Sequence, residues 1–220
     1  MKKSRREFLG AITAAGAMLA GCAGNVPAGR RYAKVIDAHA HWYPREFVTL
    51  LEKEGPQYGA KMGKTPQGHS LVQSVPGGTQ SSVMPPNMIE IDLILKEMDE
   101  REVDMYALSM TNPMVYWCPA QFGLKLSIAH NDACAAACAK YPQRFVGTIS
   151  LPMQDAKLAV QELQRAAKLP GMRAIYLAEN INGKNLHEKE FWPVYEAAQA
   201  LDLPLFLHNL YPTGGERMKD

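Results

Sequence analysis

At 220 residues the chain has room for one sizeable domain, and 47% hydrophobic with 21% charged residues is an ordinary composition for a folded protein. The formal net charge is +2, but the first 21 residues hold four of the 24 basic and one of the 22 acidic side chains, which leaves 20 basic against 21 acidic ones. The rest of the chain is therefore near neutral, which argues against nucleic-acid binding through a broad basic face.

The first residues, MKKSRREFLGAITAAGAMLAGC, have the layout of an export signal, because a basic start precedes an apolar stretch too short to span a bilayer comfortably. SRREFLG resembles the twin-arginine export pattern, and LAGC resembles a lipoprotein cleavage box in which Cys22 becomes the acylated first residue. We predict a signal over 1–21, a linker over 22–33, and a periplasmic or cell-surface protein held at the membrane by a lipid on Cys22. The alternative is a chance basic start on a membrane-anchor helix.

With Cys22 assigned to lipidation, Cys118, Cys134 and Cys138 remain, and an odd number gives no closed disulfide framework. Cys134 and Cys138 lie four residues apart in an alanine-rich run, NDACAAACAKYP, so they share a helix face. Because no further metal ligands lie nearby in the sequence, small buried thiols are favoured over a metal site.

After the linker, strands and helices alternate along the chain. In chain order the apolar patterns predict a strand over 33–41, a helix over 44–55, a helix over 88–102, a strand over 103–109, a helix over 119–142, a strand over 144–150, a helix over 155–169 with Asp155 as its N-cap, a strand over 172–178, a helix from Phe191 to Leu201 and a strand over 204–209. Residues 56–87 carry no sustained period and many Gly and Pro, which predicts an insertion loop that acts as a lid or a binding segment.

This alternation predicts an α/β fold with a parallel sheet covered by helices. Two architectures compete, an open doubly wound sheet and a (β/α)₈ TIM-type barrel. No G-x-G-x-x-G turn follows the first strand, which disfavours the dinucleotide-binding version of the open sheet. Chemistry-bearing side chains at the C-terminal ends of strands favour the barrel.

Three histidines lie at the C-terminal ends of predicted strands. His39 and His41, in VIDAHAHWYP, are two residues apart in a strand and face the same way, so they can bind one divalent ion, most readily zinc. Two polar residues at a strand end are the alternative. His208 ends the fifth strand and would lie at the same mouth of a barrel, where three nitrogen ligands with an open fourth position make a catalytic arrangement. The alternative for His208 is a histidine satisfied by a nearby backbone group.

Aromatic and polar side chains follow the first two strands and would share the rim with the histidines. Trp42, Asn112 and Trp117 are candidate substrate-binding residues, since aromatic rings there can stack on a flat conjugated acid. Packing at the rim is the alternative. The remaining histidines, His69, His130 and His187, are assigned solvent or packing roles.

Five segments, IDAHAHWYP, ALSMTNPMVYW, YPQRFVGTISLPMQDAKLAVQEL, EFWPVYEAA and LPLFLHNLYPTGGERMKD, resemble the amidohydrolase superfamily, and most closely its branch typified by aminocarboxymuconate-semialdehyde decarboxylase. The resemblance runs from about residue 34 to the last residue. It implies a (β/α)₈ barrel with His39, His41 and His208 as ligands of a divalent metal. It also implies decarboxylation of a small unsaturated or aromatic carboxylic acid, with metal-dependent hydrolysis of an amide or lactone as the alternative.

The family pattern departs from this sequence in two places. A histidine used as acid/base and an aspartate used as metal ligand are expected past Asp220, so no catalytic acid/base is assigned here. We therefore expect 34–220 to be the N-terminal part of a barrel, its first five βα units, and an inactive exported fragment is a further alternative. The arginine that positions the substrate carboxylate in the decarboxylases has no counterpart between Arg45 and Arg101. The substrate and the oligomeric state, with a homo-oligomer as one outcome, stay open.

Overall fold

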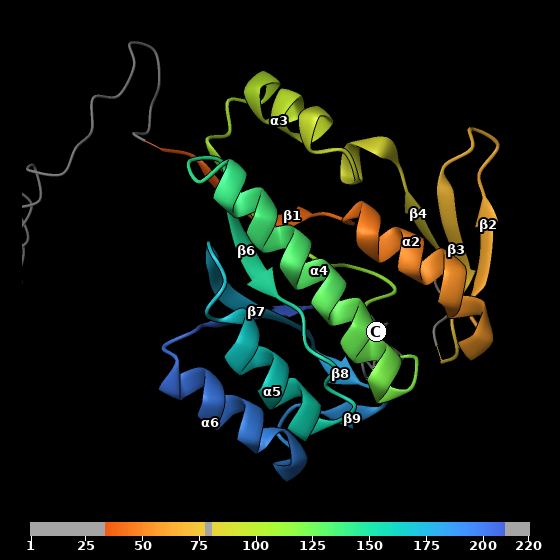
Figure 1. Ribbon diagram of the computed structural model, residues 1–220, viewed down its shortest axis with the longest axis vertical. Coiled ribbons are helices and arrows are strands. Elements are labelled where there is room, and N and C mark those ends of the chain that lie inside the picture. The colour runs from red at the N-terminus through yellow and green to blue at the C-terminus, as the bar shows by residue number, and fades with distance from the viewer. Residues whose placement is uncertain (1–33, 78–80, 210–220) are drawn as a thin grey trace, which may run out of the picture. The chain divides into compact units, whose positions relative to one another are not determined.

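The expected alternation of strands and helices runs from Ile36 to His208 in the computed structural model (Figure 1). The structure describes residues 34–77 and 81–209. The predicted export signal, the linker and Cys22 lie outside these residues. The chain divides into two units at Val35, and all that follows concerns the unit that begins at Ile36. Within the described residues no helix combines the length and the apolar character needed to cross a membrane.

Five parallel strands form the main sheet. They are β1 (Ile36–His41), β5 (Met105–Ser109), β6 (Phe145–Ile149), β7 (Met172–Ala178) and β10 (Leu205–His208). Their order in the sheet is β1-β5-β6-β7-β10, which is also their order along the chain. A doubly wound sheet reverses its strand order at a switch point, whereas a barrel does not. The sheet is therefore a curled half-barrel, and the predicted barrel-type fold is confirmed for these strands.

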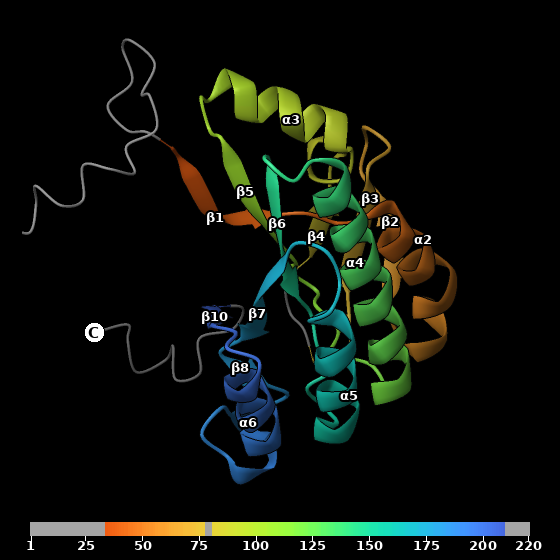
Figure 2. The same cartoon turned by 60° about the vertical axis from the view of Figure 1, so that its left-hand side comes forward.

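Helices connect the strands and cover one face of the sheet. They are α2 (Arg45–Glu54), α3 (Ile91–Glu100), α4 (Ala120–Lys140), α5 (Ala156–Ala166) and α6 (Trp192–Ala200), with short 3-10 turns η2 (Gly55–Tyr58), η3 (Pro86–Met88) and η4 (Lys189–Phe191). Figure 2 shows α4 and α5 running along one side of the strands. The predicted N-cap of α5 is confirmed, since Asp155 accepts a hydrogen bond from the backbone N–H of Leu158 at 3.0 Å.

The core lies between the helices and the central strands. Leu108, Ile149, Ile175 and Leu177 are fully buried on the helix-facing side of the sheet. Residues at alternate positions of the same strands, such as Ser109 and Tyr176, face the other side. The strands thus present an apolar face to the helices and a more polar face to the inside of the half-barrel.

The prediction of a loop over 56–87 is wrong. The segment holds three short strands, β2 (Lys61–Lys64), β3 (Ser70–Ser74) and β4 (Ser82–Met84), which form an antiparallel sheet beside α2 (Figure 1). In β4 the alternation is present, because Met84 is buried and Val83 is 44% exposed. Strands this short leave too few residues for a period to stand out among the surrounding glycines and prolines.

A second small hairpin follows β7. It pairs β8 (Asn180–Ile181) with β9 (Lys184–Asn185) across a two-residue Asn-Gly turn. Asn182 and Gly183 both have positive φ, 52° and 86°, which is the backbone that a type I′ hairpin turn requires.

Candidate metal centre

Three imidazoles that are far apart in the sequence meet at the C-terminal ends of β1 and β10. The Nε2 atom of His41 lies 2.9 Å from Nε2 of His39 and 3.2 Å from Nε2 of His208. One candidate ligand atom from each of the three residues lies within 4.8 Å of the others. The structure therefore brings together the three histidines that the sequence singled out.

Curvature of the sheet makes this meeting possible. β1 and β10 are the two outermost strands of five. Neighbouring strands lie about 4.8 Å apart, so in a flat sheet the outermost two would be about 19 Å apart. A separation of 3.2 Å between the Nε2 atoms of His41 and His208 requires the sheet to curl around the site.

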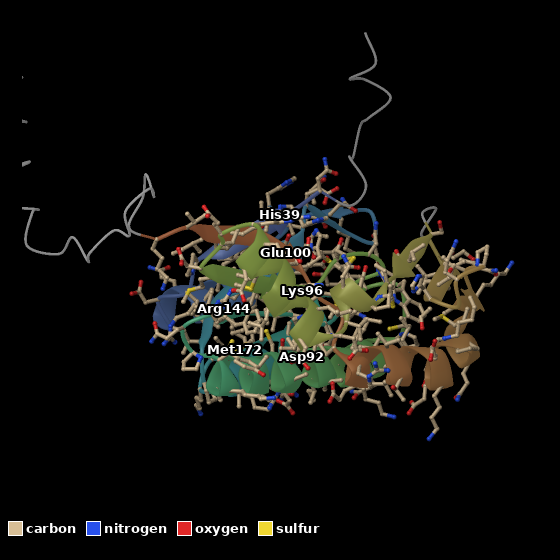
Figure 3. The ribbon with its side chains drawn as sticks, turned by 90° about the horizontal axis from the view of Figure 1, so that it is seen from above. His39, Asp92, Lys96, Glu100, Arg144 and Met172 are labelled. Atoms are coloured by element: carbon tan, nitrogen blue, oxygen red, sulfur yellow. The ribbon has the colours of Figure 1, made fainter. Side chains whose placement is uncertain are left out.

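An irregularity in β1 also shapes the site. The pairing of β1 with β5 shifts register between Asp37 and Ala40. The backbone N–H of His39, inside this irregularity, donates to the Asp37 carboxylate at 2.9 Å instead of to a neighbouring strand. Bulges of this kind re-aim side chains, and here both histidines of the pair point toward His208. In Figure 3, His39 lies on the side of the sheet away from α4.

Burial favours the neutral form of two of the three imidazoles, His41 and His208. It lowers the pKa of His41 to about 4, with further lowering by His208 and His39 and a smaller opposing effect of Asp37. Burial likewise lowers the pKa of His208, with His39 adding to the shift and Glu179 opposing it. Neutral imidazoles have a free nitrogen lone pair, which is the form that binds metal ions.

The spacing of the nitrogens fits a single divalent cation. Imidazole nitrogens bind Zn²⁺ at about 2.1 Å, which places two tetrahedral ligand atoms about 3.4 Å apart. The two Nε2 separations, 2.9 and 3.2 Å, are shorter by a few tenths of an ångström. Both contacts would need to open by a few tenths of an ångström to reach the spacing around a bound zinc ion.

Two residues that the sequence analysis missed support the cluster. The Ser109 hydroxyl lies 3.4 Å from Nδ1 of His41 and donates a hydrogen bond to the Ala40 carbonyl at 3.2 Å. The Tyr176 ring centroid lies 6.4, 6.5 and 5.6 Å from those of His39, His41 and His208. Both face the inside of the half-barrel. Strand alternation could have placed them there, but neither residue type draws attention on its own.

A cavity of about 180 Å³ opens beside the histidines. His39 and His41 line it together with Asp37 and Tyr106, and Glu97 and Arg101 of α3 close its other side. Arg101 forms a 2.6 Å ion pair with Glu97, so its charge is already compensated. The lining of this cavity therefore places both acidic and basic side chains near the histidine cluster.

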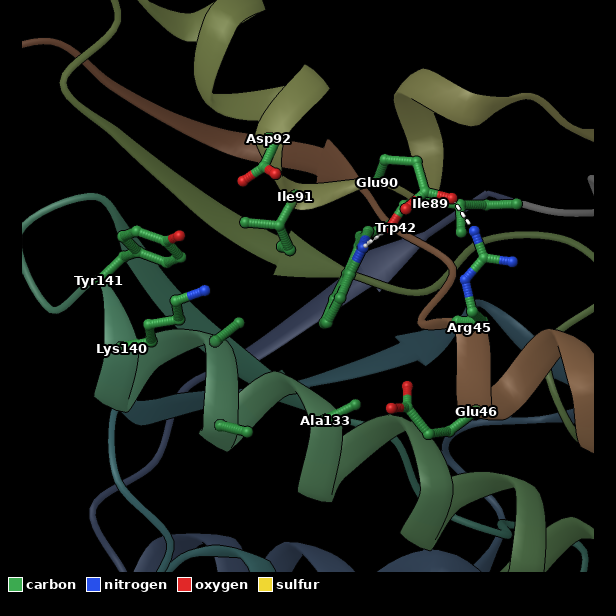
Figure 4. A pocket seen from close by; sticks show the side chains of 12 residues that line it. Trp42, Arg45, Glu46, Ile89, Glu90, Ile91, Asp92, Ala133, Lys140 and Tyr141 are labelled. Atoms are coloured by element: carbon green, nitrogen blue, oxygen red, sulfur yellow. Dashed lines mark hydrogen bonds and ion pairs between the residues drawn. The ribbon is translucent and has the colours of Figure 1, made fainter.

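The expectation that Trp42 shares the mouth with the histidines is wrong. Its backbone N–H still pairs with Ser109 at 2.9 Å, so the strand ladder continues beyond His41 and Trp42 faces the opposite side. The indole is 4% exposed and donates to the Ile89 carbonyl at 2.9 Å. It lines a different cavity, of about 370 Å³, next to Ala133 of α4 (Figure 4).

The other two candidate substrate-binding residues, Asn112 and Trp117, contact neighbouring parts of the chain. The Asn112 carbonyl accepts a hydrogen bond from the Tyr43 hydroxyl. The Trp117 indole donates to the Met114 carbonyl at 3.2 Å and packs edge-on against Phe122 of α4, with ring centroids 6.1 Å apart. Their role in substrate binding stays a prediction.

The described cysteines match the expected buried thiols. Cys118, Cys134 and Cys138 are all free and buried. His130 is also buried, which agrees with its packing assignment, and burial lowers its pKa to about 4. None of these four residues belongs to the histidine cluster.

Two curated relatives cover much of this chain. A 2-amino-3-carboxymuconate-6-semialdehyde decarboxylase of Dictyostelium discoideum is 31% identical over 184 residues, which are 83% of this chain and 51% of the relative. A gamma-resorcylate decarboxylase of a Polaromonas species is 32% identical over 132 residues, 55% of this chain and 39% of the relative. The chain thus spans about half the length, or less, of the curated relatives it matches.

A solved structure shares the fold. The crystal structure of a dihydroxybenzoic acid decarboxylase from a Polaromonas species, with bound manganese and the inhibitor 2-nitroresorcinol, superposes with a TM-score of 0.60 at 24% identity. The match covers 84% of this chain and 52% of that one. The sequence profile of the amidohydrolase family matches residues 36–214. The chain therefore belongs to the amidohydrolase family.

Proposed function

We propose that this chain supplies the metal centre of a divalent-metal-dependent decarboxylase that acts on a small unsaturated or aromatic carboxylic acid. The observation that carries the proposal is the convergence of the Nε2 atoms of His39, His41 and His208 from opposite edges of the sheet. The two curated relatives, both decarboxylases by name, support the reaction type.

The histidines would hold the cation, and the cation would polarise the oxygen atoms of a bound acid. Decarboxylation leaves an electron pair on the carbon that loses CO₂, so the substrate needs a conjugated system to accept it and a proton to replace the carboxylate. Burial lowers the pKa of His41 and of His208, which favours the neutral form that binds a metal ion. The described residues therefore supply binding and orientation.

Zinc is the metal that we propose, since three neutral imidazoles suit it better than they suit harder cations. Manganese is the principal competitor, because the related crystal structure holds it. Elemental analysis of protein purified without chelators distinguishes the two. About one equivalent of zinc is expected, and one equivalent of manganese would replace zinc in the proposal.

The reaction is tested on metal-loaded protein with the acids that the relatives decarboxylate, 2-amino-3-carboxymuconate semialdehyde and gamma-resorcylate. Release of CO₂ that disappears in His208→Ala and persists in His69→Ala supports the proposal. His69 is the matched control because it lies in the turn between β2 and β3, outside the cluster. Opening of an amide or lactone without CO₂ release would favour the hydrolase instead.

We also propose that the chain is exported and lipid-anchored through Cys22. SRREFLG and LAGC support this proposal. Labelling of cells with an alkyne fatty acid should tag the wild-type protein and leave Cys22→Ala untagged, and Arg5→Lys with Arg6→Lys should retain the precursor in the cytoplasm. Equal labelling of the wild type and Cys22→Ala would contradict lipid attachment at Cys22.

A further inference from the structure

The Nε2 atom of His41 is common to both short contacts of the cluster, so the orientation of this one ring determines whether the three nitrogens meet. Its other ring nitrogen, Nδ1, points at the Ser109 hydroxyl at 3.4 Å. By contrast, Nδ1 of His208 is buried and has no hydrogen-bond partner among the described residues. Among the described residues, Nδ1 of His41 therefore has a polar neighbour, whereas Nδ1 of His208 has none.

A count of hydrogens at Ser109 determines which partner donates. A serine hydroxyl has one hydrogen and two lone pairs. Its hydrogen goes to the Ala40 carbonyl, which can only accept and which is the nearer partner, at 3.2 Å against 3.4 Å for Nδ1 of His41. The hydroxyl oxygen is then left to accept from Nδ1 of His41. The Tyr176 phenol is a further hydrogen-bond neighbour of the same hydroxyl.

The same count assigns the tautomer of His41. If Nδ1 carries the proton, Nε2 carries the lone pair, and that lone pair faces the other two imidazoles. Metal-bound histidines in proteins almost always donate their second N–H to an outer partner, which fixes both tautomer and ring orientation. Ser109 is placed to be that partner, and it is fully buried, so water does not compete for the contact.

Tyr176 is the second residue that packs against the histidine cluster. It is 5% exposed and sits edge-on to His39 and His41, with interplanar angles of 82° and 78°. Its ring contacts the rings of all three histidines, and its hydroxyl is a hydrogen-bond neighbour of Ser109. Because strand positions two apart share a face, Tyr176 lies below the level of Ala178, the register partner of His208.

We infer that Ser109 and Tyr176 are positioning residues that hold His41 as its Nδ1–H tautomer with Nε2 presented to a metal ion. The inference rests on the proposed metal centre. It adds residues that touch no metal themselves, and it makes the affinity of the site depend on a buried hydroxyl one strand away from the ligands.

The test compares Zn²⁺ affinity, by competition with a chromogenic chelator, for the wild-type chain, Ser109→Ala, Tyr176→Phe and Thr148→Val. Thr148 is the matched control, since its buried hydroxyl also donates to a strand carbonyl, Leu108 at 2.9 Å, without touching a histidine. Loss of an outer-shell partner weakens metal binding by about 10- to 100-fold. We expect at least a tenfold loss for Ser109→Ala, a smaller loss for Tyr176→Phe, and wild-type affinity for Thr148→Val.

A second readout, ¹⁵N NMR of the imidazoles in metal-free protein, separates this inference from the proposed function. His41 should be protonated at Nδ1 in the wild type and a mixture of tautomers in Ser109→Ala. If the wild type fails to bind Zn²⁺, the proposed function fails, and the NMR result alone decides the role of Ser109. Unchanged affinity in Ser109→Ala, an equal loss in Thr148→Val, or an unchanged His41 tautomer in Ser109→Ala would overturn the inference.

Discussion

The two faces of the five-stranded sheet differ in function: one packs the apolar core, and the other carries side chains that contact the histidine cluster. On the helix-facing side of the central strands, Leu108, Ile175 and Leu177 are fully buried and apolar. On the inner side, the same strands carry Ser109 and Tyr176 beneath the histidine cluster. Because successive residues of a strand point to opposite faces, one short stretch of sequence contributes both stability and chemistry. Substitutions on the two faces should therefore affect different measurements.

The largest effect is expected on the inner face. His208→Ala removes one of the three proposed ligands, and we expect Zn²⁺ affinity to fall by more than the roughly 100-fold that loss of an outer-shell partner can cost. The free energy of unfolding of the metal-free protein should change little, because the imidazole is only half-buried and its Nδ1 has no described partner to lose. Chelator competition and urea denaturation measure the two quantities. A variant that keeps its metal affinity would remove His208 from the site.

The outer face should show the reverse pattern. Leu177→Ala opens a cavity at a fully buried position and should lower the free energy of unfolding by about 2–5 kcal/mol while the folded protein keeps its metal affinity. Its register partner on β10, Leu207, is the matched control, since it is 59% exposed. Leu207→Ala should cost well under half as much. Equal losses, or a change in metal affinity in Leu177→Ala, would contradict the division between the faces.

A pH effect is expected from the layer of helices behind the sheet. The pKa of His130 falls from 6.5 to about 4 on folding because the ring is completely buried. Between these values the unfolded chain binds a proton that the folded chain does not, so stability is lost as pH falls. The loss from His130 alone is about 2 kcal/mol between pH 7.5 and pH 5. Urea denaturation at both pH values measures it.

The clustered histidines complicate that measurement, because the pKa of His41 is also lowered, to about 4, and gives a loss of the same sign. Comparing wild type with His130→Leu isolates the buried ring. The variant should show a pH dependence that is smaller by about 2 kcal/mol. An identical pH dependence in both proteins would show that His130 is not buried in its neutral form.

The smallest effect is expected at the start of α5, far from the inner face. Asp155→Ala removes the N-cap hydrogen bond to Leu158 and should cost about 1 kcal/mol of stability. Asp155→Asn keeps an acceptor and is the control, with a loss of a few tenths of a kcal/mol. Neither variant should alter Zn²⁺ affinity, and a thermal melt with and without metal checks both statements.

Much of the fold was predictable because its strands and helices repeat apolar residues at their own periods. β7, for example, spans the predicted residues 172–178 without any difference. The three-stranded sheet of β2, β3 and β4 was not predictable in this way, since strands of three to five residues show at most two alternations. Long, periodic elements are visible in sequence, and short ones become visible only through their pairing.

The candidate site shows a similar division. The two-residue spacing of His39 and His41 in a strand made them candidate ligands from sequence alone. Whether His208 reaches them depends on sheet curvature, which no local sequence pattern encodes. Trp42 was misplaced because the strand ladder continues one residue past His41 and so reverses the direction of its side chain. Ser109 was missed because a single serine gains its meaning only from the atoms around it.

The central claim is that one cation is held by imidazoles from both edges of the sheet. X-ray absorption at the zinc edge, on protein loaded with one equivalent of Zn²⁺, tests it most directly. The account predicts three imidazole nitrogens at about 2.0–2.1 Å in the wild type and two in His208→Ala. A wild-type spectrum with fewer than three imidazole ligands, or one that His208→Ala leaves unchanged, would contradict it.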